Sequence, residues 1–251
     1  MKSNNIYTSD THEWFMFARD PEKPESVIDT NQYMIKTKHN ALLMDPGGIE
    51  LFAPMLASVV KELPIEQIKH VFASHQDPDI ISSLGLWDKA LSDATLYSPR
   101  IWEGFLRHFG METMEFHGIP DEGGALTIDQ TEVQFIPAHY LHSSGNFNVY
   151  DAQAKILMSG DIGAALEHID APIEVEDFDA HIRYMEGFHK RWMPSNRAKN
   201  DWVERVSKLD IEKLCPQHGR IFTGDNVKRF LDWFEALEVG CAVENYASKR
   251  C

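Results

Sequence analysis

The sequence predicts an α/β fold made of two similar halves. Residues 71 to 97 give the order strand, helix, strand, which is a βαβ unit. A β-rich run followed by helices occurs twice, roughly on either side of residue 110. Polar clusters also recur directly after predicted strands, which is where α/β sheets present side chains to a functional site.

The N-terminal half begins with strands and then alternates between strands and helices. Apolar residues recur at helical spacing from Ile49 to Leu63 and predict a helix over residues 49–62 with one buried face. The short apolar run from Val71 to Ser74 predicts a buried strand. Further strands are expected at residues 12–19, 32–37, 40–45 and 94–97, and helices at 80–91 and 99–109.

The C-terminal half repeats this order of elements. Polar and apolar residues alternate over 132–137, as in a half-buried strand, and a hairpin joins 148–150 to 155–158. Helices are expected at 179–192, at 197–209 with Ser195 or Asn196 as its cap, and at 225–238, with a last strand at 211–215. Chains of this length form one large domain as often as two. No linker separates the two halves, and we expect one domain spanning residues 1–251.

Composition and charge exclude several classes of function. The chain has 39 acidic and 24 basic residues and a formal charge of −15, which works against binding nucleic acid or an anionic membrane. No apolar stretch approaches the length of a membrane span, and the first twenty residues lack a signal-peptide core. Three cysteines are too few for a thiolate metal cluster and fit a reducing compartment. These features predict a cytoplasmic protein with a small ligand or a protein partner.

The first polar cluster is His75-Gln76-Asp77-Pro78-Asp79, directly after the predicted strand at Val71. In extended chain, residues at i, i+2 and i+4 point the same way, so His75, Asp77 and Asp79 can converge. One imidazole and two carboxylates suit iron, manganese or zinc. The alternative interpretation is a solvated polar loop. Asp45 lies at the end of an earlier strand. It could orient a metal-binding side chain through a hydrogen bond, or it could only cap its own turn or the next helix.

Other histidines and an aspartate follow later strands. His139 and His142 come after the strand at 132–137, Asp161 follows the strand at 155–158, and His218 follows the last strand. His181 and His189, by contrast, lie among many charges on one predicted helix, and we expect them to be solvated.

Taken in order, these motifs resemble the metallo-β-lactamase superfamily over essentially the whole chain. The resemblance implies an αββα four-layer sandwich with a two-metal site at one edge of its sheets. Hydrolytic members carry H-x-H-x-D-H in the first motif, whereas this chain has Asp77 and Ile80 in place of two of the histidines. A carboxylate at the second position resembles the flavodiiron proteins. The stretches 139–147 and 159–163 look closer still to oxygen-binding diiron proteins, which are stand-alone relatives of the flavodiiron core.

The resemblance also implies a ligand set for two iron ions. One iron would be held by His75, Asp77 and His139, the other by Asp79 and His218, with Asp161 bridging them. With this set, both iron ions have fewer than six ligands, so a coordination position stays open. His142 would lie beside that open position or replace His139 as the ligand. Tyr140 would line the pocket at the open position or serve only in packing.

The function implied is that of a non-haem diiron protein that binds dioxygen and reports oxygen or redox state to a protein partner, in signalling or chemotaxis. Because the sequence contains no Gly-rich dinucleotide loop and no CxxC pair, we expect no FMN bound by this chain. The alternatives are an oxygen or nitric oxide reductase with an external electron donor, a metal-dependent hydrolase, and a binding protein without catalysis. A homodimer, as in flavodiiron relatives, is a further expectation.

Overall fold

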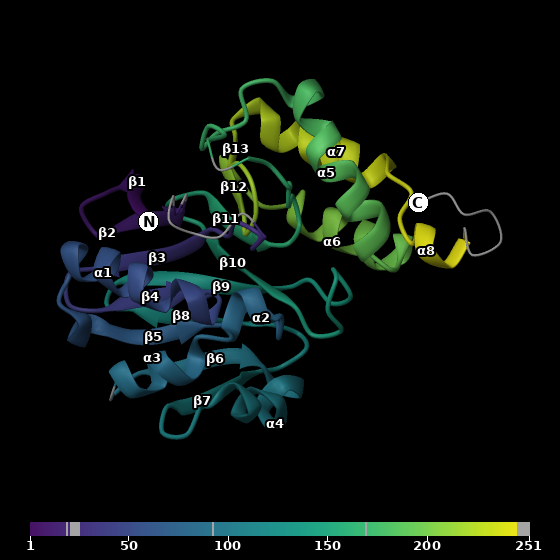
Figure 1. Ribbon diagram of the computed structural model, residues 1–251. Coiled ribbons are helices and arrows are strands. Elements are labelled where there is room, and N and C mark those ends of the chain that lie inside the picture. The colour runs from purple at the N-terminus through teal and green to yellow at the C-terminus, as the bar shows by residue number, and fades with distance from the viewer. Residues whose placement is uncertain (19, 21–25, 92, 169, 245–251) are drawn as a thin grey trace. The chain divides into compact units, whose positions relative to one another are not determined.

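The computed structural model describes residues 1–18, 20, 26–91, 93–168 and 170–244. Within it the chain forms two compact units, Met1–Phe135 and a second unit that begins at Ile136 (Figure 1). Arg19, which was expected to end a strand, lies outside the described residues.

The first unit is built on a seven-stranded sheet whose strands follow one another in sequence order. The strands up to β4 pair antiparallel, and β4 to β7 pair parallel. Parallel neighbours need crossover connections, which helices provide here. The strands are β1 (Lys2–Thr8), β2 (His12–Ala18), β3 (Gln32–Thr37), β4 (Ala41–Met44), β5 (Ile68–Phe72), β6 (Thr95–Pro99) and β7 (Glu115–Ile119).

Helices bury their apolar faces against this sheet. Met55 and Val59 of α1 (Phe52–Glu62) and Trp87 of α3 (Leu84–Ala90) belong to the same buried cluster as Leu43 and Val71 of the strands. Two shorter helices are α2 (Pro78–Ile81) and α4 (Glu103–Leu106). One-turn 3₁₀ helices occur at Ile49–Leu51, Ile65–Gln67, Arg100–Trp102 and Arg107–Phe109.

A hairpin completes the first unit. Strands β8 (Gly124–Ile128) and β9 (Thr131–Pro137) pair antiparallel. The ring of Phe135 stacks on Phe72 of β5 with centroids 5.4 Å apart and an interplanar angle of 8°. Asp129 in the hairpin turn accepts hydrogen bonds from Thr37 Oγ1 at 2.7 Å and from the backbone N–H of His39 at 2.8 Å. The hairpin is thus fixed by ring packing at one end and by hydrogen bonds at the other.

The second unit contains four further strands. They are β10 (Phe147–Asp151), β11 (Ile156–Gly160), β12 (Lys213–Pro216) and β13 (Phe222–Thr223). The pair β10–β11 is an antiparallel hairpin, whereas β11 and β12 run parallel, and β13 returns antiparallel to β12. Because β11 and β12 are parallel, their carboxyl ends lie together. The residues after Gly160 and after Pro216 therefore emerge at the same edge.

Three longer helices enclose the core of the second unit. They are α5 (Phe178–Trp192), α6 (Asn196–Val206) and α7 (Asp225–Ala236), followed by the short α8 (Cys241–Glu244). Ser195 caps α6, as predicted, by accepting a hydrogen bond from the N–H of Ala198 at 3.2 Å. The buried rings of Phe230 and Phe234 stack with centroids 5.5 Å apart and form the centre of the apolar cluster.

Three elements differ from the sequence expectation. The predicted helix over 80–91 is split into α2 and α3, because the backbone N–H of Ser83 donates to Gly47 O at 3.2 Å, in the turn that follows β4, and Ser83 Oγ donates to the same oxygen. The predicted helix at 99–109 consists of α4 flanked by 3₁₀ turns. Strand β1 was not expected because its sequence is mostly polar. It is defined by its pairing with β2, which is a non-local contact.

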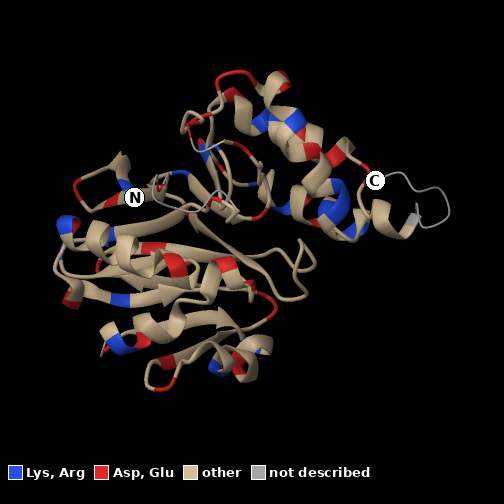
Figure 2. Cartoon of the chain, in the orientation of Figure 1, with Lys and Arg blue, Asp and Glu red and all other residues tan. Residues whose placement is uncertain are grey.

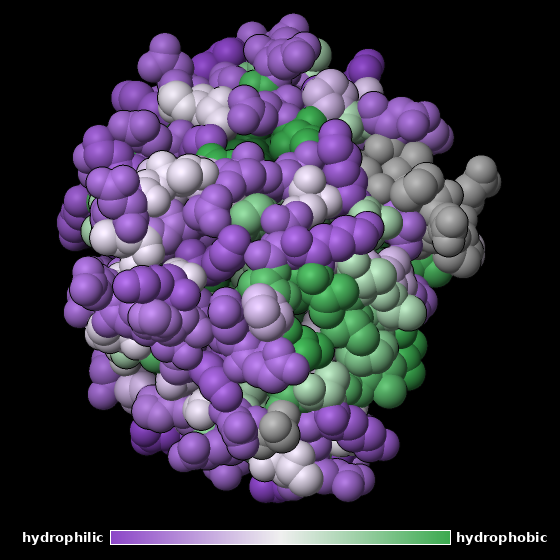
Figure 3. All heavy atoms as spheres, turned by 90° about the vertical axis from the view of Figure 1, so that its left-hand side faces the viewer, coloured by the Kyte–Doolittle hydropathy of each residue, from purple (hydrophilic) through white to green (hydrophobic). Residues whose placement is uncertain are grey.

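The surface carries the charged residues that the composition predicts. Figure 2 shows acidic and basic residues distributed over helices and loops. On the face shown in Figure 3, hydrophilic residues predominate around a region of hydrophobic ones. Within the described ranges, none of the helices combines the length and apolarity that crossing a membrane requires.

Candidate metal-binding site

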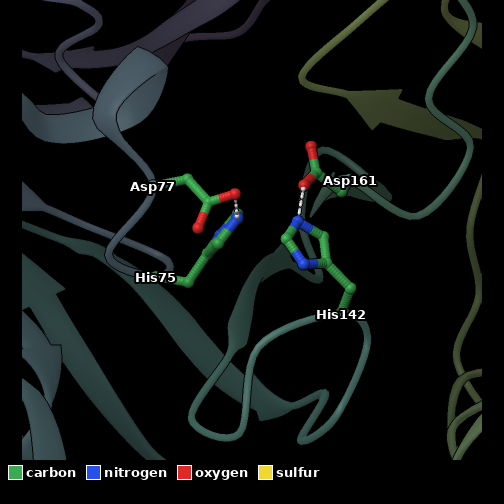
Figure 4. Close-up of side chains that lie close together, drawn as sticks. All are labelled: His75, Asp77, His142 and Asp161. Atoms are coloured by element: carbon green, nitrogen blue, oxygen red, sulfur yellow. Dashed lines mark ion pairs between the residues drawn. The ribbon is translucent and has the colours of Figure 1, made fainter. Parts of the chain in front are cut away.

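Residues that could hold a metal lie at strand ends in both units. The first cluster consists of His75, Asp77 and Asp79, directly after β5. The second cluster consists of His142, Asp161 and His218, and the predicted ligand His139 lies on the same loop as His142. Figure 4 shows one histidine–aspartate pair from each cluster, with a dashed line joining the two members of each pair.

In the first cluster the imidazole of His75 is fully buried, and its Nε2 lies 3.8 Å from Asp77 Oδ2 (Figure 4). Asp77 occupies the cap position of α2, yet its side chain makes no capping hydrogen bond. Its Oδ1 instead accepts a hydrogen bond from Gln76 Nε2 at 3.4 Å, and its Oδ2 faces His75, a position from which it can serve as a metal ligand. Asp79, in the first turn of α2, is half-buried.

A hydrogen-bond chain fixes the tautomer of His75. Asp45 accepts from the backbone N–H of Ser74 at 2.7 Å and from Ser74 Oγ at 2.8 Å. Since the Ser74 hydroxyl proton is donated to Asp45, Ser74 Oγ must accept at its 2.9 Å contact with His75 Nδ1. Nδ1 therefore carries the proton and Nε2 presents a lone pair. Asp45 thus acts on His75 through one hydroxyl, as carboxylates behind metal-binding histidines do.

The turn that carries Asp45 is held against α2. Asp45 has a φ of +48°, a conformation uncommon for residues other than glycine, and its N–H donates to Phe72 O at 2.8 Å. The N–H of Gly47 donates to Ile80 O at 2.7 Å. Ile80 is fully buried in the apolar cluster of the first unit. Of the two positions that differ from the hydrolytic pattern, the one occupied by Ile80 is therefore a core position in this chain.

In the second cluster Asp161 is the central residue. Its Oδ2 lies 2.8 Å from His142 Nε2, and its Oδ1 lies 3.2 Å from His218 Nε2 (Figure 4 shows the first of these contacts). Asp161 and His218 are buried, and the side chain of His142 is 12% exposed. Each carboxylate oxygen thus faces a different imidazole, which is an arrangement suited to a bridging ligand.

The two histidines of the 138–146 loop have different surroundings. His142 lies against Asp161, whereas the ring of His139 meets Phe147 edge-on, with centroids 5.1 Å apart. Which of the two binds metal stays a prediction. Tyr140, between them in sequence, is 55% exposed and has a φ of +64°.

His189 was expected to be solvated, and this was wrong. It is fully buried; its Nε2 accepts a hydrogen bond from the N–H of Gly163 at 2.9 Å, so its Nδ1–H donates to Met185 O at 2.7 Å. Burial lowers the pKa of His189 to about 4, so the ring is neutral. His189 thereby holds the loop that carries Asp161. The charged residues near His189 in the sequence suggested a solvated side chain, but they lie on the other face of α5.

His181, on the same helix, is also buried rather than solvated. Its Nδ1 lies 3.7 Å from Glu167 Oε2, and Glu167 pairs with Arg220 through contacts of 2.7 and 3.1 Å. Burial alone would raise the pKa of Glu167, but its contacts with His181 and Arg220 more than offset this and lower it. Since Glu167 follows Asp161 and Arg220 follows His218, this pair ties together the two loops of the second cluster.

Aromatic side chains from α5 line one side of the second cluster. Trp192 meets the ring of His142 edge-on, with centroids 5.2 Å apart, and stacks on Phe188 at 5.9 Å. Trp192 is 52% exposed. No pattern in the sequence indicates this contact, because it depends on how α5 packs.

The chemistry of the donor set fits iron. The two clusters offer imidazole nitrogen and carboxylate oxygen, and none of their members is a thiolate. Such mixed nitrogen and oxygen donors suit non-haem iron, with manganese and zinc as competitors. In addition, His75 is held in the tautomer that a metal ligand needs.

Comparisons with solved structures give the same family as the sequence motifs. A structure described as a peroxy diiron species of chemotaxis sensor ODP is 33% identical, covers 98% of this chain and 99% of its own, and has a TM-score of 0.86. The apo state of chemotaxis sensor ODP from T. denticola is 34% identical, covers 97% and 98%, and has a TM-score of 0.87. A flavo di-iron protein mutant from Thermotoga maritima is 18% identical, covers 93% of this chain and 60% of its own, and has a TM-score of 0.80. The predicted α/β sandwich of the metallo-β-lactamase fold is thereby confirmed.

Among curated proteins, an uncharacterised protein of Methanocaldococcus jannaschii is 26% identical over 81% of this chain and 52% of its own length. A second protein of that organism is 24% identical over 87% of this chain and 55% of its own. The chain spans about half the length of these relatives. The family model described as "ODP family beta lactamase" matches residues 28–219. The chain therefore belongs to the ODP family, within the metallo-β-lactamase superfamily.

Proposed function

We propose that this protein is a non-haem diiron protein that binds dioxygen and reports oxygen or redox state to a protein partner. The observation that carries the proposal is the 33% identity, over nearly the full length of both chains, to a chemotaxis sensor described with a peroxy diiron species. The donor set supports it, because imidazoles and carboxylates follow the strands β5, β9, β11 and β12.

The proposed centre draws its ligands from both clusters. His75, Asp77 and His139 would hold one iron, Asp79 and His218 would hold the other, and Asp161 would bridge. His142 would either replace His139 as the ligand or lie beside the open coordination position and donate a hydrogen bond to a ligand bound there. Tyr140 would line the pocket at this position. Within the second unit, the two imidazoles on the two oxygens of Asp161 support a bridging role for that carboxylate.

Bound iron would supply one-electron redox chemistry toward dioxygen, which zinc lacks. Residues of this chain would keep the ligands in place for iron. Asp45 and Ser74 keep the proton on Nδ1 of His75, so that Nε2 stays available. His189 keeps the Asp161 loop in place without adding charge. Three carboxylates, from Asp77, Asp79 and Asp161, would offset three of the four positive charges of two divalent cations and leave one positive charge on the centre.

The remaining parts of the proposal concern cell location and partners. We place the protein in the cytoplasm, without FMN of its own, and with a signalling or chemotaxis protein as its partner. A homodimer is proposed by analogy with flavodiiron relatives. An oxygen or nitric oxide reductase fed by an external donor is the second candidate, and the fold shared with flavodiiron proteins favours it. A hydrolase is less favoured, because Asp77 and Ile80 replace two histidines of the hydrolytic pattern.

Metal analysis combined with optical spectra tests the proposal. The protein would be reconstituted and reduced without oxygen, and its spectrum recorded before and after air is admitted. We expect about two iron ions per chain and a new visible charge-transfer band. A persistent band supports binding and sensing, whereas repeated consumption of dioxygen with an added donor supports the reductase. Zinc with no spectral response to air would contradict the diiron proposal and favour the hydrolase.

A further inference from the structure

The outer face of α1 carries almost no polar side chains. The segment from Leu51 to Val60 contains no charged residue, and its one polar side chain, that of Ser58, is buried and bonds to Pro54 O at 2.9 Å. A surface helix normally has a polar face opposite its buried one, as α7 does with its five charged residues. The outer face of α1 therefore lacks the polar surface that a helix facing water carries.

This face is nevertheless exposed. Ile49 and Val60, near its two ends, are 61% and 50% exposed. Between them Ala53 and Ala57 are exposed, and Leu56 is half-buried. Figure 3 views the side of Figure 1 on which α1 lies, and hydrophobic residues form a continuous region there. An exposed apolar face of this kind marks a surface that binds another molecule.

Two charged residues of opposite sign lie at the ends of this face. Glu50 lies just before α1 and Lys61 in its last turn, and both are exposed. Neither forms an ion pair with another residue that the structure describes. Their separation in sequence corresponds to about three helical turns, so the two side chains lie on the same side of the face, about 16 Å apart along the helix.

We propose that the outer face of α1 binds the same face of a second copy of the chain, with the two helices antiparallel. A two-fold axis through the middle of the pair brings Glu50 of each copy opposite Lys61 of the other, so both charges gain a partner at once. The same register places Ile49 of each copy beside Val60 of the other. The two exposed alanines at the centre are small and let the helices approach closely. Because the face is complementary to itself, it favours a second copy over an unrelated partner.

This interface rests on the homodimer part of the proposed function and does not involve the metal centre. Sedimentation equilibrium of the metal-free protein tests it, at concentrations up to about 200 µM, which cover the weak affinities of small interfaces. We expect a reversible equilibrium between monomer and dimer. A monomer at every concentration would overturn the proposal and leave the diiron proposal untouched.

A matched pair of variants locates the interface. Ala57→Glu places a carboxylate at the centre of the face and should abolish the dimer, because each copy would bury an unpaired charge. Ala180→Glu makes the same change at an exposed position of α5 and should leave the equilibrium unchanged. A dimer that Ala57→Glu leaves intact would use another face, which would refute this interface while the homodimer itself remained.

Charge reversal tests the antiparallel register. Lys61→Glu and Glu50→Lys should each weaken the dimer about tenfold, because each creates two contacts between like charges. The double variant exchanges the two charges and should restore the affinity of the unmodified protein. Repulsion between whole chains of charge −15 predicts the opposite for Glu50→Lys, which makes the chain less negative. A tighter dimer of Glu50→Lys, or a double variant no tighter than the single ones, would contradict the proposed pairing.

A membrane surface is the other occupant that an apolar helix face could bind. Flotation of the metal-free protein with vesicles of neutral phosphatidylcholine distinguishes it. We expect the protein to stay unbound, because the dimer covers the face. Vesicle binding that Ala57→Glu abolishes, by a protein that is monomeric without vesicles, would overturn the proposal in favour of a lipid surface.

Discussion

The two candidate clusters are built in different ways. In the first, three candidate ligand side chains come from five consecutive residues just after β5, and one hydroxyl connects His75 to Asp45. In the second, the candidate ligands come from three separate segments, and buried groups of α5 and the Glu167–Arg220 pair hold these segments. A cluster from one segment depends on its own backbone, whereas a cluster from several segments depends on the packing beneath it.

The largest expected effect is the loss of metal when a carboxylate is removed. If Asp161 bridges, Asp161→Ala should lose nearly all iron, whereas Asp77→Ala should keep about one iron per chain, because it removes a terminal ligand. Metal analysis after anaerobic reconstitution measures both. Asp170→Ala removes an exposed carboxylate from the same stretch of chain and should keep about two. Equal iron in the Asp161 and Asp77 variants would contradict the bridging assignment.

A smaller effect on metal binding is expected from Ser74, whose hydroxyl connects His75 to Asp45. Ser74→Ala breaks the connection to Asp45 and should weaken metal binding about 10- to 100-fold while the ligands remain. Competition with a chromogenic iron(II) chelator measures the affinity. Ser98→Ala is a matched control, since Ser98 is equally buried and bonds to Ala73 O at 3.0 Å. If both variants bind iron as the unmodified protein does, the hydrogen-bond chain has no role in metal binding.

The smallest effect is the pH dependence of stability that His189 gives to the second unit. Burial lowers its pKa to about 4 from the ordinary value of 6.5, so between these values the unfolded chain takes up a proton that the folded chain does not. Its stabilising contribution is therefore full above pH 6.5 and is lost as the pH falls toward about 4.

Urea unfolding of the metal-free protein at pH 7 and at pH 5 measures this contribution. Between these two values the unmodified protein should lose about 2 kcal/mol more stability than His189→Gln, which cannot titrate. The comparison of the two proteins removes the effect of carboxylates that also titrate in acid. Parallel pH profiles would show that His189 is not held neutral by burial. They would contradict its role as the neutral group that holds the Asp161 loop.

Local sequence determined the first cluster. Histidine and aspartate at alternate positions after a buried strand can be identified without any tertiary contact, whereas the sequence left two roles open for Asp45, orienting a ligand or capping its turn. The order of the strand-end motifs also determined the family, because each motif is short and its place along the chain is fixed. The residue types at these strand ends therefore indicated metal chemistry from the sequence alone.

Only the tertiary structure decided how the second cluster is supported. The burial of His189 and its bond to Gly163 join residues 26 positions apart, and the contact of Trp192 with His142 joins two separate segments. Charged neighbours made His181 and His189 look solvated, because sequence spacing does not show which face of a helix the fold will bury. Whether His139 or His142 lies beside Asp161 likewise depends on the path of a loop, which is set by non-local packing and not by the residues of the loop itself.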